Sequence, residues 1–291
     1  MHWVDHGGPA GAPVLVCVHG LGGSLLNWAA VAPSLARDHR VVALDLPGFG
    51  RSHGAGRPTS VRANRRVLHR FLADVVGEPV VLVGNSMGGT ITAIQTAREP
   101  DTVRGLVLLN PALPVRVLAR PDPAVLTSFT LYASPAGRAV LSRWRRLRTP
   151  EQTVYDMLRL CCADPSRVPH DVVRLHIAAA RERRDVQGID ADFLAAARSL
   201  LWTIGRRRHY AELLARIRPP VLLLHGTRDR LVPIQAARAA ARANPSWRFE
   251  VAHGVGHVPQ LEAPQWTAAT IRQWLADEVA APGAPAAHGR T

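Results

Sequence analysis

The sequence predicts an α/β fold in which a mostly parallel β-sheet is flanked by helices and an all-helical segment is inserted between two strands. Short continuous apolar runs, bounded by glycine, proline or aspartate, recur along the chain, and such runs are typical of strands buried on both faces. Segments with helical spacing separate these runs, as parallel neighbours require. The strand signal then disappears between residues 113 and 205, which predicts the helical insertion.

Candidate strands and helices alternate along the rest of the chain. Its 291 residues are enough for one large core. The candidate strands are residues 14–18, 41–44, 80–83, 103–109, 221–224 and 247–251. The candidate helices are residues 24–36, 61–76, 87–98, 234–243 and 264–279.

The end and the return of this alternation predict the domain boundaries. We expect residues 1–113 and 206–279 to form the α/β core. Residues 114–205, which are rich in alanine, arginine and leucine and interrupted by prolines, are expected to form a helical cap. The low-complexity residues 280–291 predict a disordered tail.

The composition is that of a globular protein. Hydrophobic residues make up 47% and charged residues 20% of the chain, which excludes disordered, collagen-like and coiled-coil proteins. No apolar run approaches the roughly 18 residues that cross a bilayer, and the first run, residues 14–18, is too short and too late for a signal peptide. The cysteines Cys17, Cys161 and Cys162 form no even disulfide framework. Together these features predict a cytoplasmic protein.

The formal net charge of +14 comes from arginine, because the sequence contains no lysine. Coding bias is the favoured explanation, and attraction to anionic lipid or to an acidic substrate stays open as a second hypothesis. The arginine clusters contain no nucleic-acid motif and aromatic residues are 5% of the chain, so we expect no nucleic-acid partner. No cysteine and histidine spacing resembles a zinc site, so we expect no metal and no cofactor. The sequence carries no signal for an oligomeric state.

The strongest local motif is Gly84-Asn85-Ser86-Met87-Gly88, a G-x-S-x-G pentapeptide directly between a candidate strand and a candidate helix. In that position the chain turns so tightly that small residues must flank the serine, whose hydroxyl then projects above the sheet. Ser86 would lie at the N-terminus of the following helix, where the helix dipole favours developing negative charge. Ser86 is therefore the candidate nucleophile.

A serine hydroxyl needs a base and a group that orients the base. His257 follows the candidate strand 247–251, and Asp229 follows the candidate strand 221–224. The chain order Ser86, Asp229, His257 is the order of serine, acid and histidine in hydrolases with this motif. Asn110 occupies the alternative acid position after residues 103–109, but its amide cannot carry the charge that stabilises an imidazolium.

The glycine-rich stretch His19-Gly-Leu-Gly-Gly-Ser24 follows the first candidate strand. Such a loop lets backbone N–H groups approach a reacting oxygen, and we expect the amides of Leu21 and Met87 to form the oxyanion hole. The stretch lacks the lysine of a phosphate-binding loop and the spacing G-x-G-x-x-G. Nucleotide binding is therefore disfavoured.

With these motifs in order, the chain resembles α/β-hydrolase fold proteins with a serine nucleophile and a helical cap. The segments that carry the resemblance are His19-Gly20, Asp45-Leu-Pro-Gly-Phe-Gly-Arg-Ser52, Gly84-Asn-Ser-Met-Gly-Gly89, Gly226-Thr-Arg-Asp229 and Gly256-His257 with Glu262. The resemblance covers nearly the whole chain and implies an eight-stranded type of sheet with the cap after the sixth strand. It also implies Ser86 as nucleophile, His257 as general base and then acid, and Asp229 as the residue that orients His257.

The resemblance narrows the reaction without fixing the substrate. Epoxide hydrolases and haloalkane dehalogenases resemble the chain but use aspartate where Ser86 stands. We therefore expect a carboxylic ester hydrolase that acts through an acyl-enzyme on a small or medium apolar ester. The alternatives are a carbon–carbon bond hydrolase of ring-fission diketones, a noncatalytic ligand-binding homologue and a perhydrolase. Carbon–carbon hydrolases typically carry a Gly-Pro-Gly element and a tryptophan after the histidine, whereas this chain has Leu21-Gly-Gly-Ser24 and Val258-Pro259.

Overall fold

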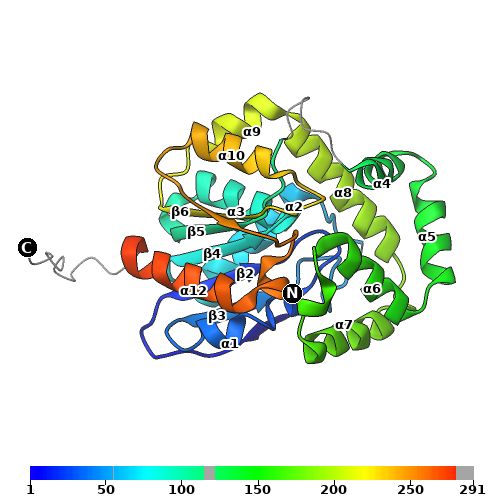
Figure 1. The fold of residues 1–291 in the computed structure, drawn as a ribbon, viewed down its shortest axis with the longest axis horizontal. Helices are drawn as coiled ribbons and strands as arrows, with labels where there is room; N and C mark the ends of the chain where they lie inside the picture. Colours follow the sequence, from blue (N-terminus) through cyan, green and yellow to red (C-terminus); the bar gives the residue numbers. More distant parts are fainter. Residues whose placement is uncertain (55, 115–121, 280–291) are drawn as a thin grey trace, which may run out of the picture.

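The structure is a computed structural model that describes residues 1–54, 56–114 and 122–279. A seven-stranded sheet with the order β1-β3-β2-β4-β5-β6-β7 forms its centre (Figure 1). All neighbouring pairs are parallel except β1 and β3, which confirms the mostly parallel sheet. The strands are β1 (Trp3–Asp5), β2 (Val14–Val18), β3 (Arg40–Leu44), β4 (Val80–Asn85), β5 (Val103–Leu109), β6 (Val221–Gly226) and β7 (Arg248–Ala252).

Six of these strands coincide with the candidate strands, and β1 has no counterpart among them. Strand β1 is three residues long and alternates between exposed and half-buried positions, so it gives no continuous apolar run. The described sheet has one strand fewer than the eight implied by the resemblance. The helical insertion was expected after the sixth strand. In this sheet of seven strands it follows the fifth, β5.

Helices cover both faces of the sheet because alternate residues of each central strand enter two different cores. Val16 and Leu82 belong to one apolar cluster, whereas Leu15 and Val81 belong to the other. The first core lies under α2 (Val61–Phe71), α3 (Met87–Arg98) and α10 (Ile234–Ala243), and the second under α1 (Ala32–Leu35) and α12 (Pro264–Trp274) (Figure 1). Both strand faces are buried, as the continuous apolar runs predict.

Three expected helices differ in detail. The segment 24–36 forms the 3₁₀ helix η1 (Leu25–Trp28) and the short helix α1, because Pro33 lies in the first turn of α1 and cannot continue a preceding helix. The segments 61–76 and 264–279 end in π-helical turns, η2 (Leu72–Val76) and η5 (Leu275–Val279).

Between β5 and β6 the described residues form helices and no strand. These helices are α4 (Pro123–Ala133), α5 (Gly137–Leu147), α6 (Pro150–Cys161), the short η4 (Pro165–Arg167), α7 (His170–Glu182), α8 (Ile189–Gly205) and α9 (Arg207–Leu214). Helices α4 to α8, hereafter the inserted helices, lie together at one end of the sheet (Figure 1). Helix α9 packs against α3, and its Tyr210 is buried in the same cluster as Leu82.

The division into a core and a cap at residues 113/114 and 205/206 stays a prediction, and the expected tail 280–291 lies outside the described residues. No helix in the described ranges is long and apolar enough to cross a bilayer. Cys17, Cys161 and Cys162 are free thiols.

Candidate active site

Ser86 occupies the turn between β4 and α3. Its backbone angles, φ 54° and ψ −118°, are unusual for a residue with a side chain and are those of a strained strand-to-helix turn. Gly88 allows this turn, because a Cβ atom there would lie 2.2 Å from the carbonyl oxygen of Val18 on the neighbouring strand. The local sequence therefore forces Ser86 to the apex of the turn.

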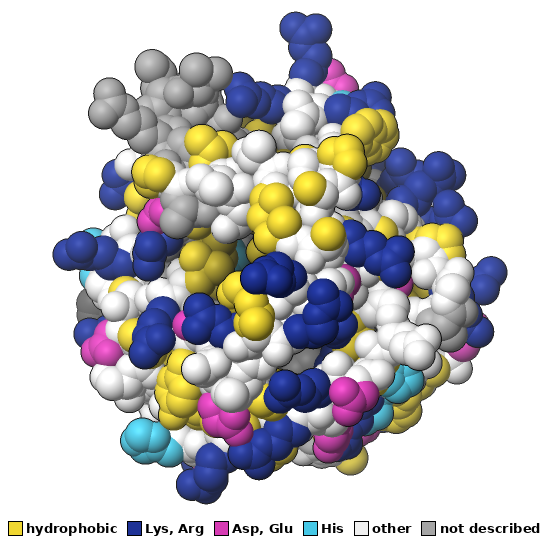
Figure 2. All heavy atoms as spheres, turned by 90° about the vertical axis from the view of Figure 1, so that its right-hand side faces the viewer, with side chains coloured by type: hydrophobic (Ala, Val, Ile, Leu, Met, Phe, Trp, Pro, Cys, Tyr) yellow, Lys and Arg dark blue, Asp and Glu magenta, His cyan; other side chains and the backbone are white. Residues whose placement is uncertain are grey.

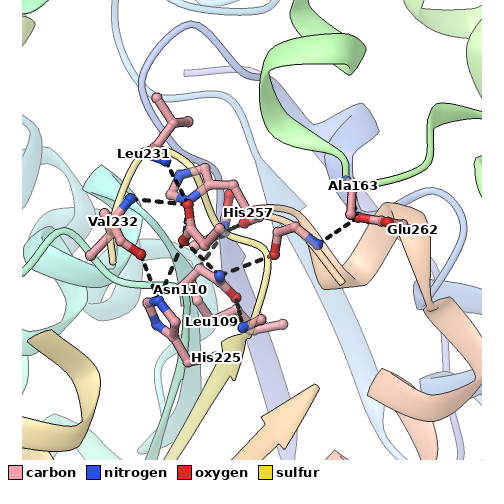
Figure 3. A network of polar contacts seen from close by, with 12 residues as sticks. Leu109, Asn110, Ala163, His225, Leu231, Val232, His257 and Glu262 are labelled. Atoms are coloured by element: carbon pink, nitrogen blue, oxygen red, sulfur yellow. Dashed lines mark hydrogen bonds and ion pairs between the residues drawn. The ribbon is translucent and has the colours of Figure 1, made fainter. Parts of the chain in front are cut away.

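Asp229 and His257 come together from loops that follow β6 and β7. His257 Nδ1 lies 2.8 Å from Asp229 Oδ2, and the Asp229 side chain is fully buried. Figure 3 shows His257 within this network of polar contacts. A proton on Nδ1 donated to the carboxylate leaves a lone pair on Nε2. That tautomer is the one that a general base requires.

The carboxylate of Asp229 is surrounded by hydrogen-bond donors. Its Oδ1 accepts from the backbone N–H groups of Leu231 at 2.8 Å and Val232 at 3.0 Å, and its Oδ2 accepts from Asn110 Nδ2 at 2.7 Å. Burial alone would raise the pKa of Asp229, but the neighbouring His257, His225 and the Asn110 amide hold the pKa below its ordinary value. Asp229 is therefore held as a carboxylate beside the imidazole.

Asn110 is a member of this network that sequence reasoning considered only as a rejected acid. It has a left-handed φ of 44°, which asparagine tolerates better than most residues. Besides donating to Asp229, its Nδ2 donates to the carbonyl oxygen of Gly256 at 3.1 Å. Asn110 thus joins the aspartate to the loop that carries His257. Its place directly after β5 was the available signal.

His225 is a second missed member. Its Nε2 lies 2.9 Å from the carbonyl oxygen of Val232 and 3.4 Å from Asp229 Oδ2. Burial lowers the pKa of His225, with the charge of Asp229 opposing that effect. In the sequence His225 only extends an apolar strand run, so no motif distinguished it.

The serine turn and the histidine loop are linked through Asn85, the residue before Ser86. Its side-chain amide donates to the carbonyl oxygens of Leu109 at 3.0 Å and His257 at 3.1 Å. Within the described residues, the Ser86 hydroxyl makes no hydrogen bond to His257. The structure therefore brings Asp229 and His257 into contact and links the backbone of His257 to the neighbour of Ser86.

The histidine loop is also fastened to the inserted helices. The backbone N–H of His257 donates to the carbonyl oxygen of Cys161 at 2.6 Å. The buried carboxylate of Glu262 accepts from the backbone of Gly256 at 2.8 Å, Asp164 at 2.9 Å and Ala163 at 3.1 Å (Figure 3). One carboxylate thus joins the loop before His257 to the end of α6.

The two oxyanion-hole candidates lie on either side of the serine turn. Leu21 is half-buried and follows Gly20, where a Cβ atom would lie 3.0 Å from Ser86 Cβ. Met87 is fully buried and is the first residue of α3. Both candidate amides thus belong to segments adjoining Ser86, and their role as donors stays a prediction.

His19 fixes the loop that contains Leu21. Its Nδ1 lies 2.7 Å from the carbonyl oxygen of Gly20, and its Nε2 accepts from the backbone N–H of Leu46 at 3.0 Å. Burial lowers the pKa of His19. Because both ring nitrogens are engaged, His19 does not compete with His257 as a base.

A cavity of about 320 Å³ lies where residues 48–54 face the turn between α7 and α8. It is lined by Gly48, His53, Gly54, Arg183, Val186, Gln187, Ile189 and Asp192, so none of Ser86, Asp229 and His257 contributes to it. In the described part of the chain, no three histidine, cysteine or acidic side chains are arranged to hold a metal ion.

Comparisons with known proteins agree with this architecture. The family description "alpha/beta hydrolase fold" matches residues 13–264. Lipase 1 of Psychrobacter immobilis is 27% identical over 273 residues, covering 92% of this chain and 78% of the lipase. The 2-hydroxymuconate semialdehyde hydrolase of Pseudomonas sp. (strain CF600) is 29% identical over 284 residues, covering 95% and 91%.

A solved thermophilic esterase from Thermogutta terrifontis has a TM-score of 0.67 and 26% identity, covering 94% of this chain and 92% of the esterase. These relatives are hydrolases of several kinds and support a hydrolase activity. Because the family match spans most of the sequence and the sheet and helices agree with it, the chain belongs to the α/β-hydrolase fold family.

Proposed function

We propose that this protein is a serine hydrolase that cleaves small or medium apolar carboxylic esters through an acyl-enzyme. Ser86 is the nucleophile, His257 the general base and acid, and Asp229 the group that orients and stabilises His257. The observation that carries the proposal is the 2.8 Å contact between His257 Nδ1 and the buried, fully hydrogen-bonded carboxylate of Asp229. The strained turn at Ser86 supports it.

The reaction begins when the Ser86 hydroxyl oxygen attacks the ester carbonyl carbon and its proton passes to His257 Nε2. The carbonyl oxygen becomes an oxyanion, which the amides of Leu21 and Met87 stabilise. The intermediate then expels the alcohol, which takes the proton from His257 and leaves the acyl group on Ser86. Water repeats the attack with His257 as base, releasing the acid and free Ser86.

An aromatic group beside the oxyanion loop supports an apolar substrate. The ring of Phe193 on α8 lies over Gly22, where a Cβ atom would be 3.2 Å from the ring. Phe193 packs edge-on against Tyr132 at 5.2 Å between centroids, and Tyr132 against Phe129 at 6.0 Å. We propose that the inserted helices form a cap, residues 114–205, whose aromatic side chains contact the acyl or alcohol group.

A serine-reactive fluorophosphonate probe tests the mechanism. The native chain is expected to be labelled and Ser86→Ala not, while Ser246→Ala, which removes an exposed serine, is labelled like the native chain. Hydrolysis of p-nitrophenyl esters of increasing acyl length then measures the substrate range. Absent labelling of the native chain, or equal labelling of Ser86→Ala, excludes the proposal and favours a noncatalytic homologue.

Carbon–carbon hydrolysis is the second candidate, because a relative named 2-hydroxymuconate semialdehyde hydrolase is 29% identical over most of both chains. The segment after the histidine, Val258-Pro259, departs from the pattern of such enzymes and favours esters. Assaying a ring-fission diketone beside the esters distinguishes the two. A kcat/KM that is higher for the diketone identifies the carbon–carbon hydrolase.

A further inference from the structure

Helix α5 presents an apolar stripe to solvent. Val140, Trp144 and Leu147 are exposed to 42%, 37% and 68%. Their spacing of four and three residues places them on one face of the helix. Apolar faces of helices in globular proteins normally pack against a core, so this stripe indicates a surface that another apolar medium covers.

Arginines border the stripe, and the helix has no acidic residue. Arg143 lies three residues after Val140 and four before Leu147, so it adjoins both on the helix surface. Arg143 and Arg146 are exposed, and among the described residues neither has an ion-pair partner, whereas Arg145 pairs with Asp190 at 3.2 Å. Two arginines without an ion-pair partner among the described residues therefore lie beside the stripe.

The neighbouring inserted helices continue this pattern. Helices α4 and α8 pack against α5 (Figure 1), and they carry Leu126, exposed to 55%, and Trp202, exposed to 65%. The guanidinium of Arg206 lies 4.7 Å from the Trp202 ring centroid. Figure 2 faces this side of the molecule and shows hydrophobic side chains lying between arginines.

We propose that the α5 surface, Val140, Arg143, Trp144, Arg146 and Leu147, binds the surface of a bilayer that contains anionic lipid. The apolar stripe enters the boundary between headgroups and acyl chains, where amphipathic basic helices bind and where tryptophan is favoured. The arginines pair with lipid phosphates, which the guanidinium binds in a bidentate manner.

The same charges disfavour a second copy of this chain as the occupant. A two-fold contact through α5 would place Arg143 and Arg146 of one copy against the same arginines of the other, with no acidic residue on the helix to neutralise them. An anionic lipid surface supplies the opposite charge and the apolar layer together. The proposal does not depend on the proposed ester hydrolysis, because Ser86 takes no part in it.

Co-sedimentation with vesicles tests the proposal. The full chain is expected to bind phosphatidylcholine vesicles containing phosphatidylglycerol, to bind pure phosphatidylcholine vesicles weakly, and to release from the former at high salt. Arg143→Gln with Arg146→Gln is expected to weaken binding by roughly tenfold or more. Leu147→Ser is expected to weaken it by several-fold. Ser86→Ala is expected to bind like the native chain.

The matched control is Arg238→Gln with Arg242→Gln on α10, which removes the same charge from exposed positions outside the inserted helices. It is expected to change binding by no more than roughly twofold. Equal losses in both double variants, absent binding to the anionic vesicles, or a dimer in solution that Leu147→Ser dissociates would each overturn the proposal. The substituted arginines and Leu147 are exposed, so unchanged melting temperatures verify that these variants are folded.

Discussion

Asn110 is an uncharged side chain that holds the charged carboxylate of Asp229 in place. Its amide lies 2.7 Å from Asp229 Oδ2 and 3.1 Å from the carbonyl oxygen of Gly256, so it fixes the carboxylate relative to the histidine loop. An aspartate at this position would place two carboxylates in contact. The amide instead donates to the acid, which lowers the pKa of Asp229.

Removing this amide is expected to reduce catalysis. Asn110→Gly should lower kcat for ester hydrolysis by about tenfold to a hundredfold, because a misplaced catalytic group costs that much. Glycine keeps the left-handed backbone at φ 44°, so the loss reports on the side chain. Asn110→Asp should also move the acidic limb of the pH–rate profile to higher pH, because the new carboxylate and Asp229 raise each other's pKa and the site then binds a proton more tightly. Unchanged kcat and an unchanged profile would contradict this role.

At the residue scale, sequence reasoning named the side chains that stand in recognisable motifs and missed their supports. Asp229 and His257 were named because each follows a strand in a glycine-containing turn, and the structure brings them into contact. His225 has no such context. Its position beside Asp229 depends on the path of the chain from Gly226 to Val232, which the residue types do not reveal.

At the scale of elements, the contact between α3 and β2 depends on glycine. A Cβ atom on Gly88 would lie 2.2 Å from the carbonyl oxygen of Val18 and 2.5 Å from that of His19. These are backbone atoms of a central strand and the loop after it. They cannot move without disturbing both the sheet and the glycine-rich loop that follows β2.

Gly88→Ala is therefore expected to lower the free energy of unfolding by about 3 kcal/mol or more. It should also reduce fluorophosphonate labelling of Ser86. The control is Gly205→Ala at the end of α8, where a Cβ atom meets nothing within 4 Å and alanine should be neutral or stabilising. Urea unfolding measures both variants. Equal free energies of unfolding for Gly88→Ala and Gly205→Ala would contradict the expected clash at Gly88.

His176 on α7 makes the inserted helices sensitive to acid. It is 8% exposed, and burial lowers its pKa to about 4, which the backbone of Leu26 only partly offsets. In the unfolded chain, His176 binds a proton below its ordinary pKa of about 6.5. In the folded chain it binds that proton only below about pH 4, so between these pH values protonation favours unfolding. Stability from this group is complete above the ordinary pKa and falls as the pH drops toward the folded value.

We expect the contribution of His176 to lower the free energy of unfolding by roughly 1 kcal/mol when the pH falls from 6 to 5. His176→Gln keeps a polar side chain and removes the titration, so its stability should fall less over the same range. Urea unfolding at the two pH values measures the difference. Parallel pH profiles for the native chain and His176→Gln would rule out this assignment.

The central strands could be predicted because their apolar runs are buried on both faces. The exceptions have local causes. Strand β1 is too short and too exposed to show a run of apolar residues. Pro33 divides residues 24–36, whose helical spacing predicted one helix, into two shorter ones. The π-helical turn after α2 ends at Gly77, which has a φ of 74°. The spacing of apolar residues does not distinguish such a turn from an ordinary α-helix.

At the scale of the whole molecule, the sequence predicted an inserted helical segment but not which residues of it face inward. Val140 and Trp202 are apolar residues of this segment, and both are exposed. Phe193 was not singled out, yet its ring lies against Gly22 in the glycine-rich loop after β2. Periodicity identifies an apolar face, whereas the neighbours of that face depend on how the helices pack together.

Arg183 and Glu262 are two of the side chains that join the inserted helices to the rest of the chain. The guanidinium of Arg183, at the end of α7, donates to the carbonyl oxygens of Gly48 and Gly50 in the loop after β3. Glu262, from α11 (Pro259–Glu262), accepts three backbone N–H groups, two of them from the end of α6. Glu262 is the more consequential, because the third donor, Gly256, precedes His257.

Glu262→Ala leaves one buried and two partly buried N–H groups without this acceptor and is expected to lower the free energy of unfolding by roughly 2 kcal/mol or more. It should also lower kcat, since the loop that holds His257 loses its link to α6. Glu262→Gln retains one acceptor oxygen and should lose less. Glu278→Ala, which removes an exposed carboxylate, should behave like the native chain. If Glu262→Ala loses stability but keeps the native kcat, the histidine loop holds its position without Glu262, through its contacts with Cys161, Asn110 and Asn85.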